Sequence, residues 1–281
     1  MTAITQNKAH SKASAPSHSR EDDYEILGRA VREAGALAAS YFKTSPKAFT
    51  KADGSQVSEA DLAVDAALKL DLTTRRKEYG WLSEESPDDR TRLKHSRVWM
   101  IDPIDGTGAF LREIPEWTVS AGLVEDGVPV LGVVYNPMRD EFFHAIRGAG
   151  AFLNDKPIHT TDQTTLEGAK MIASGGLFKK KIWDEPWPNV TAEWVNSVAY
   201  RLALVACGRG DATISLTPKA EWDLAAAAVI MEEAGGLTTD RLGNPHVYNR
   251  EDPKFSSLVG SGLALHPAPV SYTHLRAHET F

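Results

Sequence analysis

The chain has 281 residues, of which 42% are hydrophobic and 25% charged, and its formal net charge is −7. This length fits one large domain or two closely associated ones with a sizeable core. The acidic balance argues against a nucleic-acid-binding surface, which normally has a basic face. No apolar run approaches the roughly 18 residues that cross a membrane. A single cysteine, Cys207, excludes an internal disulfide and suits a reducing, cytoplasmic compartment.

Two helices are predicted in the first third of the chain. Apolar residues recur at helical spacing from 22 to 41, which indicates an amphipathic helix. After an exposed turn at 51–55, Ser58 is suited to cap a second helix that runs to about Lys77. Asp61 falls at the third position of that helix, where a capping role explains it fully from local sequence.

The central motif of the sequence covers residues 97–107. Its apolar first half predicts a buried strand that ends at Asp102 and Asp105, and paired carboxylates from one loop commonly bind Mg²⁺. Gly106 lets the backbone approach a ligand closely, and Thr107 is expected in the first turn of a helix, where free N–H groups favour an anion. Asp-Pro and Asp-Gly pairs are also ordinary turn formers, so the motif alone fits either a metal and phosphate site or a polar turn.

A second pair of carboxylates precedes this motif. Residues 80–83 predict a short strand that runs into Glu84 and Glu85. Solvated acidic residues are common at strand ends, so this pair carries little information by itself. If the two strands are neighbours, however, their carboxylates converge at one edge of a sheet and would form one metal site.

The rest of the chain predicts a strand meander and two further helices. Asp126-Gly127 favours a tight hairpin turn. Asp223 is expected to start an alanine-rich helix that is apolar nearly all round, hence buried between layers, and Gly235-Gly236 ends it. In order, the predicted elements are strands at 117–124, 130–135 and 141–146, a mixed segment at 161–194, a helix at 196–206, a strand at 211–216, a helix at 224–234, and strands near 237–239 and 257–259.

The two ends of the chain differ from the rest. Residues 1–20 are rich in Ser, Ala, Lys and His and lack an apolar core, so we interpret them as a disordered lead-in. Residues 271–281 resemble the tail that arises when a sequencing read runs into adaptor DNA. We interpret them as a non-native tail outside the fold.

Together these motifs resemble the inositol monophosphatase family. The family signature Asp-Pro-Ile-Asp-Gly-Thr is present unbroken at 102–107, its Glu-Glu pair matches Glu84-Glu85, and its Trp-Asp pair before a Gly-Gly-terminated helix matches Trp222-Asp223. The resemblance covers roughly residues 22–267. It implies an α/β fold, a layered αβαβα sandwich of the sugar-phosphatase type, over a domain at 21–269 whose two intimate subdomains divide near 155–170.

The resemblance also implies a metal-dependent phosphoric monoester hydrolase that is sensitive to lithium. Two or three Mg²⁺ ions would neutralise the phosphate and place a water in line with it. The implied roles are metal ligation by Glu84, Asp102, the carbonyl of Ile104, Asp105 and Asp223; water activation by Asp61 and Thr107; phosphate binding by Gly106 and Thr107; and auxiliary roles for Lys51 and Glu85.

The implied substrate is a small phosphorylated metabolite, and two residues favour a 3′(2′),5′-bisphosphate nucleotide such as 3′-phosphoadenosine 5′-phosphate. Ser215 stands where inositol phosphatases have a glutamate. Arg201 stands where the nucleotidases have a lysine, and a cation there would bind a second phosphate. A helix residue that reaches to solvent explains Arg201 equally well.

Other functions remain open from the sequence. Inositol-1-phosphate and histidinol phosphate are alternative substrates, and a regulatory binding protein of the same fold is an alternative function. The presence of every metal carboxylate and of Thr107 favours the enzyme. A homodimer is in keeping with the family, whereas no nucleic-acid or membrane partner is expected.

Overall fold

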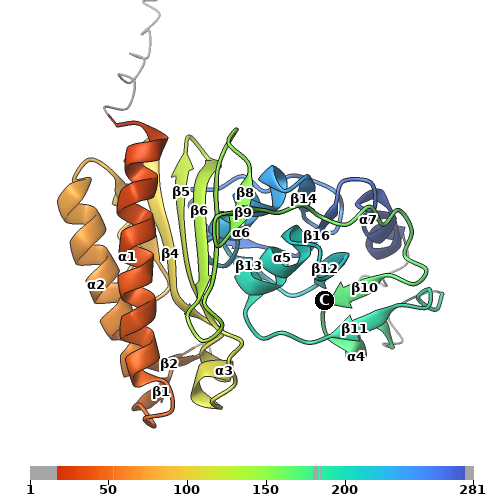
Figure 1. Ribbon diagram of the computed structural model, residues 1–281, viewed down its shortest axis with the longest axis horizontal. Helices are drawn as coiled ribbons and strands as arrows, with labels where there is room; N and C mark the ends of the chain where they lie inside the picture. Colours follow the sequence, from red (N-terminus) through yellow and green to blue (C-terminus); the bar gives the residue numbers. More distant parts are fainter. Residues whose placement is uncertain (1–17, 53, 180–182, 184, 276–281) are drawn as a thin grey trace, which may run out of the picture.

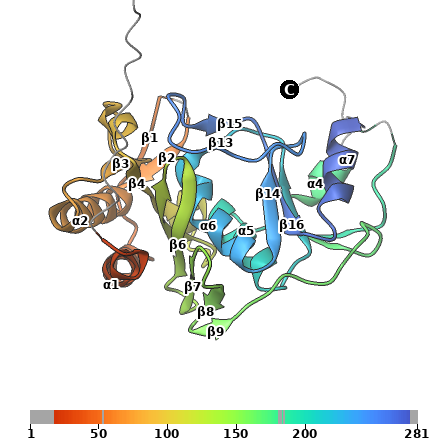
Figure 2. The ribbon, with the colours of Figure 1, turned by 90° about the horizontal axis from the view of Figure 1, so that it is seen from above.

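Helices and sheets alternate in five layers in the computed structural model, which describes residues 18–52, 54–179, 183 and 185–275. Figure 1 shows the order: α1 and α2 cover one face of the larger sheet, α5 and α6 lie between the two sheets, and α4 and α7 lie beyond the second sheet. Figure 2 shows the same order from above. The predicted αβαβα sandwich is therefore confirmed.

The helices are α1 (Arg20–Tyr41), α2 (Glu59–Arg75), the 3-10 helix η1 (Thr91–Lys94), α3 (Thr107–Leu111), α4 (Gly175–Phe178), α5 (Val198–Ala206), α6 (Glu221–Glu233) and α7 (Pro267–Leu275). None of these described helices is long and apolar enough to span a membrane.

The larger sheet has the order β3 (Gly80–Ser83), β4 (Arg97–Asp105), β5 (Thr118–Glu125), β6 (Val128–Asn136), β7 (Glu141–Ile146), β8 (Ala151–Leu153), β9 (Lys156–Pro157). The second has the order β11 (Thr191–Glu193), β10 (Lys170–Ile172), β12 (Ala212–Ser215), β16 (Leu258–Gly262), β14 (Gly236–Thr239). The described residues also form two short strand pairs, β1 (Ala48–Thr50) with β2 (Gln56–Ser58), and β13 (Lys219–Ala220) with β15 (Lys254–Phe255).

The start of α2 forms as the sequence predicts. The Ser58 side chain accepts from the Asp61 N–H, and the Asp61 carboxylate accepts from the Ser58 N–H in return. This capping box satisfies backbone donors that the first turn leaves free. The helix ends at Arg75, two residues before the predicted end. One apolar face of α2 then packs, with α1, against the larger sheet.

Strand β4 is longer than predicted. We expected it to end at the two aspartates, with the regular backbone broken between them, but it continues as a strand through Asp105. The pairing with β5 shifts register between Asp102 and Asp105, where three steps along β4 match two along β5. Such a bulge keeps the backbone in the sheet while it re-aims the side chains, and bulges are common beside active sites.

Helix α6 lies in direct contact with the larger sheet at a pair of glycines. Gly122 on β5 is opposite Gly132 on β6, and a Cβ added to Gly132 would lie 2.1 Å from the carbonyl oxygen of Ala226. The alanine-rich helix is buried as predicted. It begins at Glu221, earlier than predicted, because Asp223 acts from inside the first turn by accepting from the Ala220 N–H.

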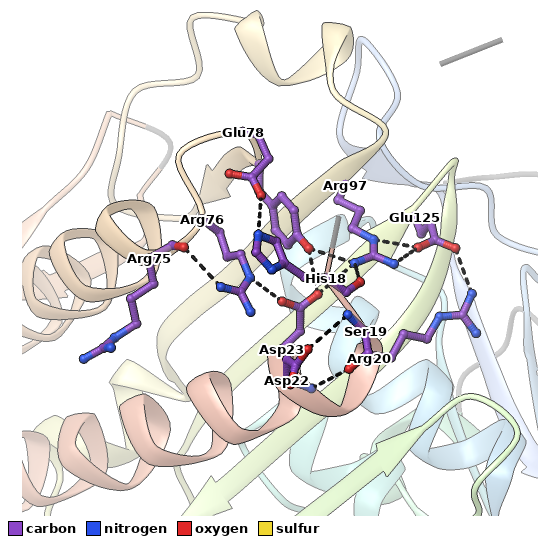
Figure 3. A network of polar contacts seen from close by, with 11 residues as sticks. His18, Ser19, Arg20, Asp22, Asp23, Arg75, Arg76, Glu78, Arg97 and Glu125 are labelled. Carbon is purple, nitrogen blue, oxygen red and sulfur yellow. Dashed lines mark hydrogen bonds and ion pairs between the residues drawn. The ribbon is translucent and has the colours of Figure 1, made fainter. Parts of the chain in front are cut away.

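The fold begins earlier in the chain than we expected from the predicted lead-in at residues 1–20. Residues 1–17 of that lead-in lie outside the described residues, but Ser19 caps α1 and the His18 carbonyl accepts from Arg97. The fully buried Asp23 lies at the centre of this region and binds both Arg76 and Arg97 (Figure 3). This network holds the start of α1 to the first residue of β4.

The C-terminal boundary also differs from the expectation. Residues 271–275 belong to α7, and Thr273 is fully buried. Residues 276–281 of the predicted tail lie outside the described part. The segment at 161–194, which the sequence left mixed, contains β10, α4 and β11.

Candidate active site

Three carboxylates from separate elements converge at one end of the larger sheet. Oxygen atoms of Glu84, Asp102 and Asp223 all lie within 4.8 Å of one another. Strands β3 and β4 are parallel neighbours with Ser83 opposite Ile101, so Glu84 and Asp102 leave the same edge of the sheet. Asp223 comes to them from the first turn of α6. The predicted convergence of the two acidic strand ends is confirmed.

The electrostatics of these three carboxylates suit a bound cation. Burial, followed by the charges of Glu84 and Asp105, raises the pKa of Asp102 well above its usual range. Burial and the charge of Asp105 raise the pKa of Asp223 to about 7. The Oδ1 atom of Asp102 is buried and has no hydrogen-bond partner among the described residues. An all-oxygen set of this kind fits a hard divalent ion such as Mg²⁺, whose charge would reverse the repulsion.

Asp105 lies close to these carboxylates but is held by the N-terminus of α5. Its Oδ2 accepts from the Ser197 hydroxyl and the Ala199 N–H, both at 2.6 Å, and its Oδ1 accepts from the Val198 N–H at 3.1 Å. Burial raises the pKa of Asp105, while these three hydrogen bonds oppose the rise. Oδ1 accepts one hydrogen bond and keeps a second lone pair, so this arrangement is compatible with metal ligation through Oδ1.

Asp61 and Thr107 are brought together from α2 and α3. The Thr107 hydroxyl lies 3.0 Å from Asp61 Oδ1 and 3.2 Å from the carbonyl oxygen of Ile104. Asp61 uses its other oxygen, Oδ2, for the Ser58 N–H at 2.8 Å. Capping and the contact with Thr107 therefore occupy different oxygens of one carboxylate. Burial raises the pKa of Asp61 despite these hydrogen bonds.

Gly106 precedes α3 in a conformation that favours glycine. Its φ is +101°, and an added Cβ would lie 3.0 Å from the carbonyl oxygen of Glu116 and 3.3 Å from the Ser197 nitrogen. Both the backbone conformation and the close approach of the α5 cap exclude a side chain here. Thr107 begins α3, as predicted.

Lys51 reaches the site from the turn between β1 and β2. Its Nζ lies 2.8 Å from Glu84 Oε1 and 2.7 Å from Glu85 Oε1. Burial disfavours the ammonium, but the hydrogen bonds to both glutamates outweigh this effect and raise the pKa of Lys51. Burial raises the pKa of Glu85 to about 7. The β1–β2 hairpin thus contacts Glu84, a candidate metal ligand, through the ammonium group of Lys51.

A cavity of about 500 Å³ is lined by Val198, whose N–H binds Asp105, and by Lys219, which lies near Asp223. Arg201 lines it with 5% of its surface exposed, so the alternative in which it reaches to solvent is wrong. Its guanidinium lies 4.0 Å from the ring centroid of Trp194 and donates to the carbonyl oxygen of Val195 at 2.5 Å. Burial lowers the pKa of Arg201 to about 10, which leaves it a cation at neutral pH. Ser215 also lines the cavity.

Sequence reasoning missed three residues of this region. Lys219 lines the cavity near Asp223, and burial lowers its pKa while the Asp223 charge opposes the change. Trp194 supports Arg201, and Ser197 both caps α5 and binds Asp105. A serine before an apolar helical run is a recognisable cap, so Ser197 could have been found from the sequence. The sequence around Trp194 and Lys219 contains no motif that would have indicated their place in the site.

Comparisons with known proteins agree on one family. A model of the inositol monophosphatase family matches residues 19–272. Inositol monophosphatase 3 of Solanum lycopersicum is 31% identical over 245 residues, which cover 82% of this chain and 90% of that protein. Nus factor SuhB of Escherichia coli strain K12 is 34% identical over 234 residues, 78% of this chain and 85% of that protein.

Solved structures have the same fold. The IMPase TM1415 of Thermotoga maritima aligns with a TM-score of 0.78 and 26% identity, over 92% of this chain and 98% of that one. The extragenic suppressor protein suhB from Bartonella henselae aligns with a TM-score of 0.77 and 25% identity, over 90% of this chain and 98% of that one.

Proposed function

The chain belongs to the inositol monophosphatase family of metal-dependent phosphatases, and from this premise we propose that it hydrolyses a small phosphate monoester with the help of Mg²⁺. The observation that carries this proposal is the buried Oδ1 of Asp102, which has no hydrogen-bond partner in the described part of the chain and lies within the trio of Glu84, Asp102 and Asp223. These three side chains, with Asp105 and the Ile104 carbonyl, would hold two or three ions. Bound Mg²⁺ would neutralise phosphate charge and favour water as the nucleophile.

The protein's own residues would then orient the water and the phosphate. Thr107 donates its hydroxyl proton to Asp61 Oδ1, which leaves the lone pairs of the Thr107 oxygen to accept from a water. Asp61, held in place by Ser58, accepts the proton that this water transfers through Thr107. The N–H groups of Gly106 and Thr107 would bind the phosphate oxygens, and the absence of a side chain at Gly106 leaves room for this approach.

The cavity favours a substrate with a second anionic group. Arg201 and Lys219 line the same cavity, one near Asp105 and the other near Asp223. Two cations beside a phosphate site bind a second phosphate through charge-assisted hydrogen bonds. We therefore propose a 3′(2′),5′-bisphosphate nucleotide, with 3′-phosphoadenosine 5′-phosphate as the first candidate. Inositol-1-phosphate is the alternative.

A regulatory role is a second candidate function. The relative from Escherichia coli, 34% identical, is named a Nus factor and not a phosphatase. For this chain the role would be a binding activity that is independent of the carboxylates. The net charge of −7 does not support RNA binding as that activity, because RNA-binding surfaces are normally basic.

The proposed function is tested by phosphate release from 3′-phosphoadenosine 5′-phosphate and from inositol-1-phosphate, measured with Mg²⁺, with a chelator, and with Asp105→Asn. We expect release that requires Mg²⁺ and falls to background in the variant, because Asp105 joins the metal site to α5. Arg201→Met and Lys219→Met should each raise KM for the bisphosphate about tenfold or more.

Each arm has an outcome that contradicts the proposal. Release that survives the chelator would rule out the metal-dependent mechanism. Faster turnover of inositol-1-phosphate, with KM for the bisphosphate unchanged in Arg201→Met, would overturn the substrate assignment. No release from either ester by the folded protein would favour the binding role.

A further inference from the structure

The turn that carries Glu84 and Glu85 is flanked by two serines that bind one buried carboxylate. That carboxylate belongs to Asp65, which lies on α2 one turn after Asp61 and is 7% exposed. The Ser83 hydroxyl donates to Asp65 Oδ1, and the Ser86 hydroxyl donates to Asp65 Oδ2 at 2.6 Å. Asp65 lies outside the acidic motifs of the sequence, and the proposed mechanism does not use it.

These contacts fix the backbone on both sides of the glutamate pair. The Glu84 N–H donates to the carbonyl oxygen of Ile101 at 3.2 Å, which keeps Glu84 beside the end of β4. The Glu85 N–H lies 3.5 Å from the Ser83 hydroxyl oxygen. Glu84 is therefore held to β4 through its own N–H, while Ser83 and Ser86, on either side of the glutamate pair, are held to Asp65 on α2.

An aspartate is the residue that this arrangement requires. A carboxylate accepts through two oxygens, so it satisfies both serine hydroxyls at once, whereas an asparagine oxygen satisfies one. Burial of a carboxylate is costly, and the two hydroxyl donors offset that cost only while both serines stay in place. The position of Asp65 and the path of the Ser83–Ser86 turn are thus coupled.

We propose that Asp65 is a positioning residue for the metal site: through Ser83 and Ser86 it fixes the turn that presents Glu84 to Asp102 and Asp223. This inference rests on the proposed function, because it takes the three carboxylates to be metal ligands. Outer partners of metal ligands typically change metal affinity by 10–100-fold when they are removed. Among the described residues the Asp65 side chain hydrogen-bonds to Ser83 and Ser86 and not to Asp61 or Thr107, so we expect its effect to fall on metal affinity.

The test is a calorimetric titration of the metal-free full-length protein with Mg²⁺ and, separately, Mn²⁺. Asp65→Ala should raise the Kd of the metal at least tenfold, while kcat at saturating metal stays within about threefold of wild type. Asp71→Ala is the matched control, because Asp71 lies on the same helix and pairs with Arg29 and Arg75 away from the turn. The control should leave the Kd unchanged.

The serines supply a second, independent arm. Ser83→Ala combined with Ser86→Ala should raise the Kd as much as Asp65→Ala does, and adding Asp65→Ala to this pair should change it no further, since all three residues act through one turn. A further loss of affinity on adding Asp65→Ala would overturn the inference, because the effect would then come from the Asp65 charge. If Asp65→Ala does not fold, the serine pair carries the test alone.

The remaining outcomes separate this inference from the proposed function. A wild-type protein that binds neither ion would overturn the proposed metal site and this inference with it. Wild-type binding with a Kd that Asp65→Ala or the serine pair changes less than twofold would overturn this inference alone. Melting temperatures of the metal-free variants show whether a change in Kd merely follows a loss of stability.

Discussion

At the scale of single residues, Asp61 shows how one carboxylate serves both folding and the site. Local sequence explains it as a helix cap, and the capping contact with Ser58 is present. The cap uses Oδ2, which leaves Oδ1 for Thr107. The structural and the functional explanations of this residue are therefore compatible, because the two oxygens of a carboxylate point to different partners.

Mutual repulsion among the site carboxylates gives the first residue-scale prediction. Burial and the charge of Asp105 raise the pKa of Asp223 to about 7, so its ionised form is disfavoured in the folded protein without metal. Asp223→Asn removes this charge and can still accept from the Ala220 N–H. We expect the metal-free Tm to rise by about 3–6 °C. Phosphatase activity should be lost in the same variant.

Differential scanning calorimetry with chelator present measures this change. Asp252→Asn, an exposed carboxylate outside the site, is the control and should leave the Tm unchanged. Addition of Mg²⁺ should stabilise wild type more than Asp223→Asn, because ligand binding to the folded state shifts unfolding by mass action. A lower metal-free Tm for Asp223→Asn would contradict the proposed repulsion.

At the scale of elements, the network around Asp23 determines how α1 joins the larger sheet. Asp23 Oδ1 accepts from Arg76 at 2.6 Å, and Oδ2 accepts from Tyr79 at 2.8 Å and from Arg97 at 3.0 Å. Arg97 continues the network to Glu125 on β5 (Figure 3). Arg97 is the first residue of β4 and Asp105 the last, so the network and the site lie at opposite ends of one strand.

Asp23→Ala should therefore reduce stability without changing the chemistry. Removal of one partner leaves buried guanidinium groups short of an anion, which typically costs about 3–5 kcal/mol. Urea unfolding measures the loss, and kcat at a temperature where the variant is folded should match wild type. Asp22→Ala is the control, since Asp22 is exposed and only caps α1 with Ser19. An equal loss of stability in Asp23→Ala and Asp22→Ala would contradict the prediction, because the loss would then come from the cap of α1.

At the scale of the whole molecule, buried histidines limit stability in acid. His266 lies next to α7 and is 5% exposed. Thr239 donates to the carbonyl oxygen of Asp240, so it accepts from His266 Nε2–H at 2.9 Å, and Ser261 then donates to Nδ1 at 3.0 Å. The neutral ring is satisfied on both sides. Burial lowers the pKa of His266 to about 4.

The sign of the pH effect follows from these pKa values. Above about pH 6.5 the ring is neutral in both states, and it has no effect on stability. As pH falls from about 6.5 to 4, the unfolded chain binds a proton that the folded protein does not, so stability falls by as much as about 3 kcal/mol. His266→Gln should flatten this part of the pH dependence, measured by urea unfolding at a series of pH values.

The exposed His159 provides the control, since His159→Gln should retain the wild-type slope. His144 and His246 also have pKa values lowered by burial, so His266→Gln is expected to remove only a part of the acid sensitivity. A slope between pH 6.5 and 4 that is the same in wild type and His266→Gln would contradict the prediction.

Much of the architecture follows from short-range patterns in the sequence. The cap at Ser58, the hairpin turn at Asp126-Gly127, where both residues have positive φ, and the burial of α6 were all predicted correctly. Each depends on residues within a few positions or on a repeated apolar spacing, which a sequence displays directly. The boundaries of β4 and α6 were wrong because a bulge and an internal cap, both tertiary features, moved them.

What the sequence by itself determined was the set of candidate site residues, because the order and spacing of the acidic motifs indicated the family. Only the tertiary structure decided how they act together. It placed β3 beside β4, turned Asp105 toward α5, buried Arg201 against Trp194, and joined Asp65 to the turn that carries Glu84. These contacts join residues far apart in the chain, and their geometry depends on strand pairing and layer packing, which no local pattern encodes.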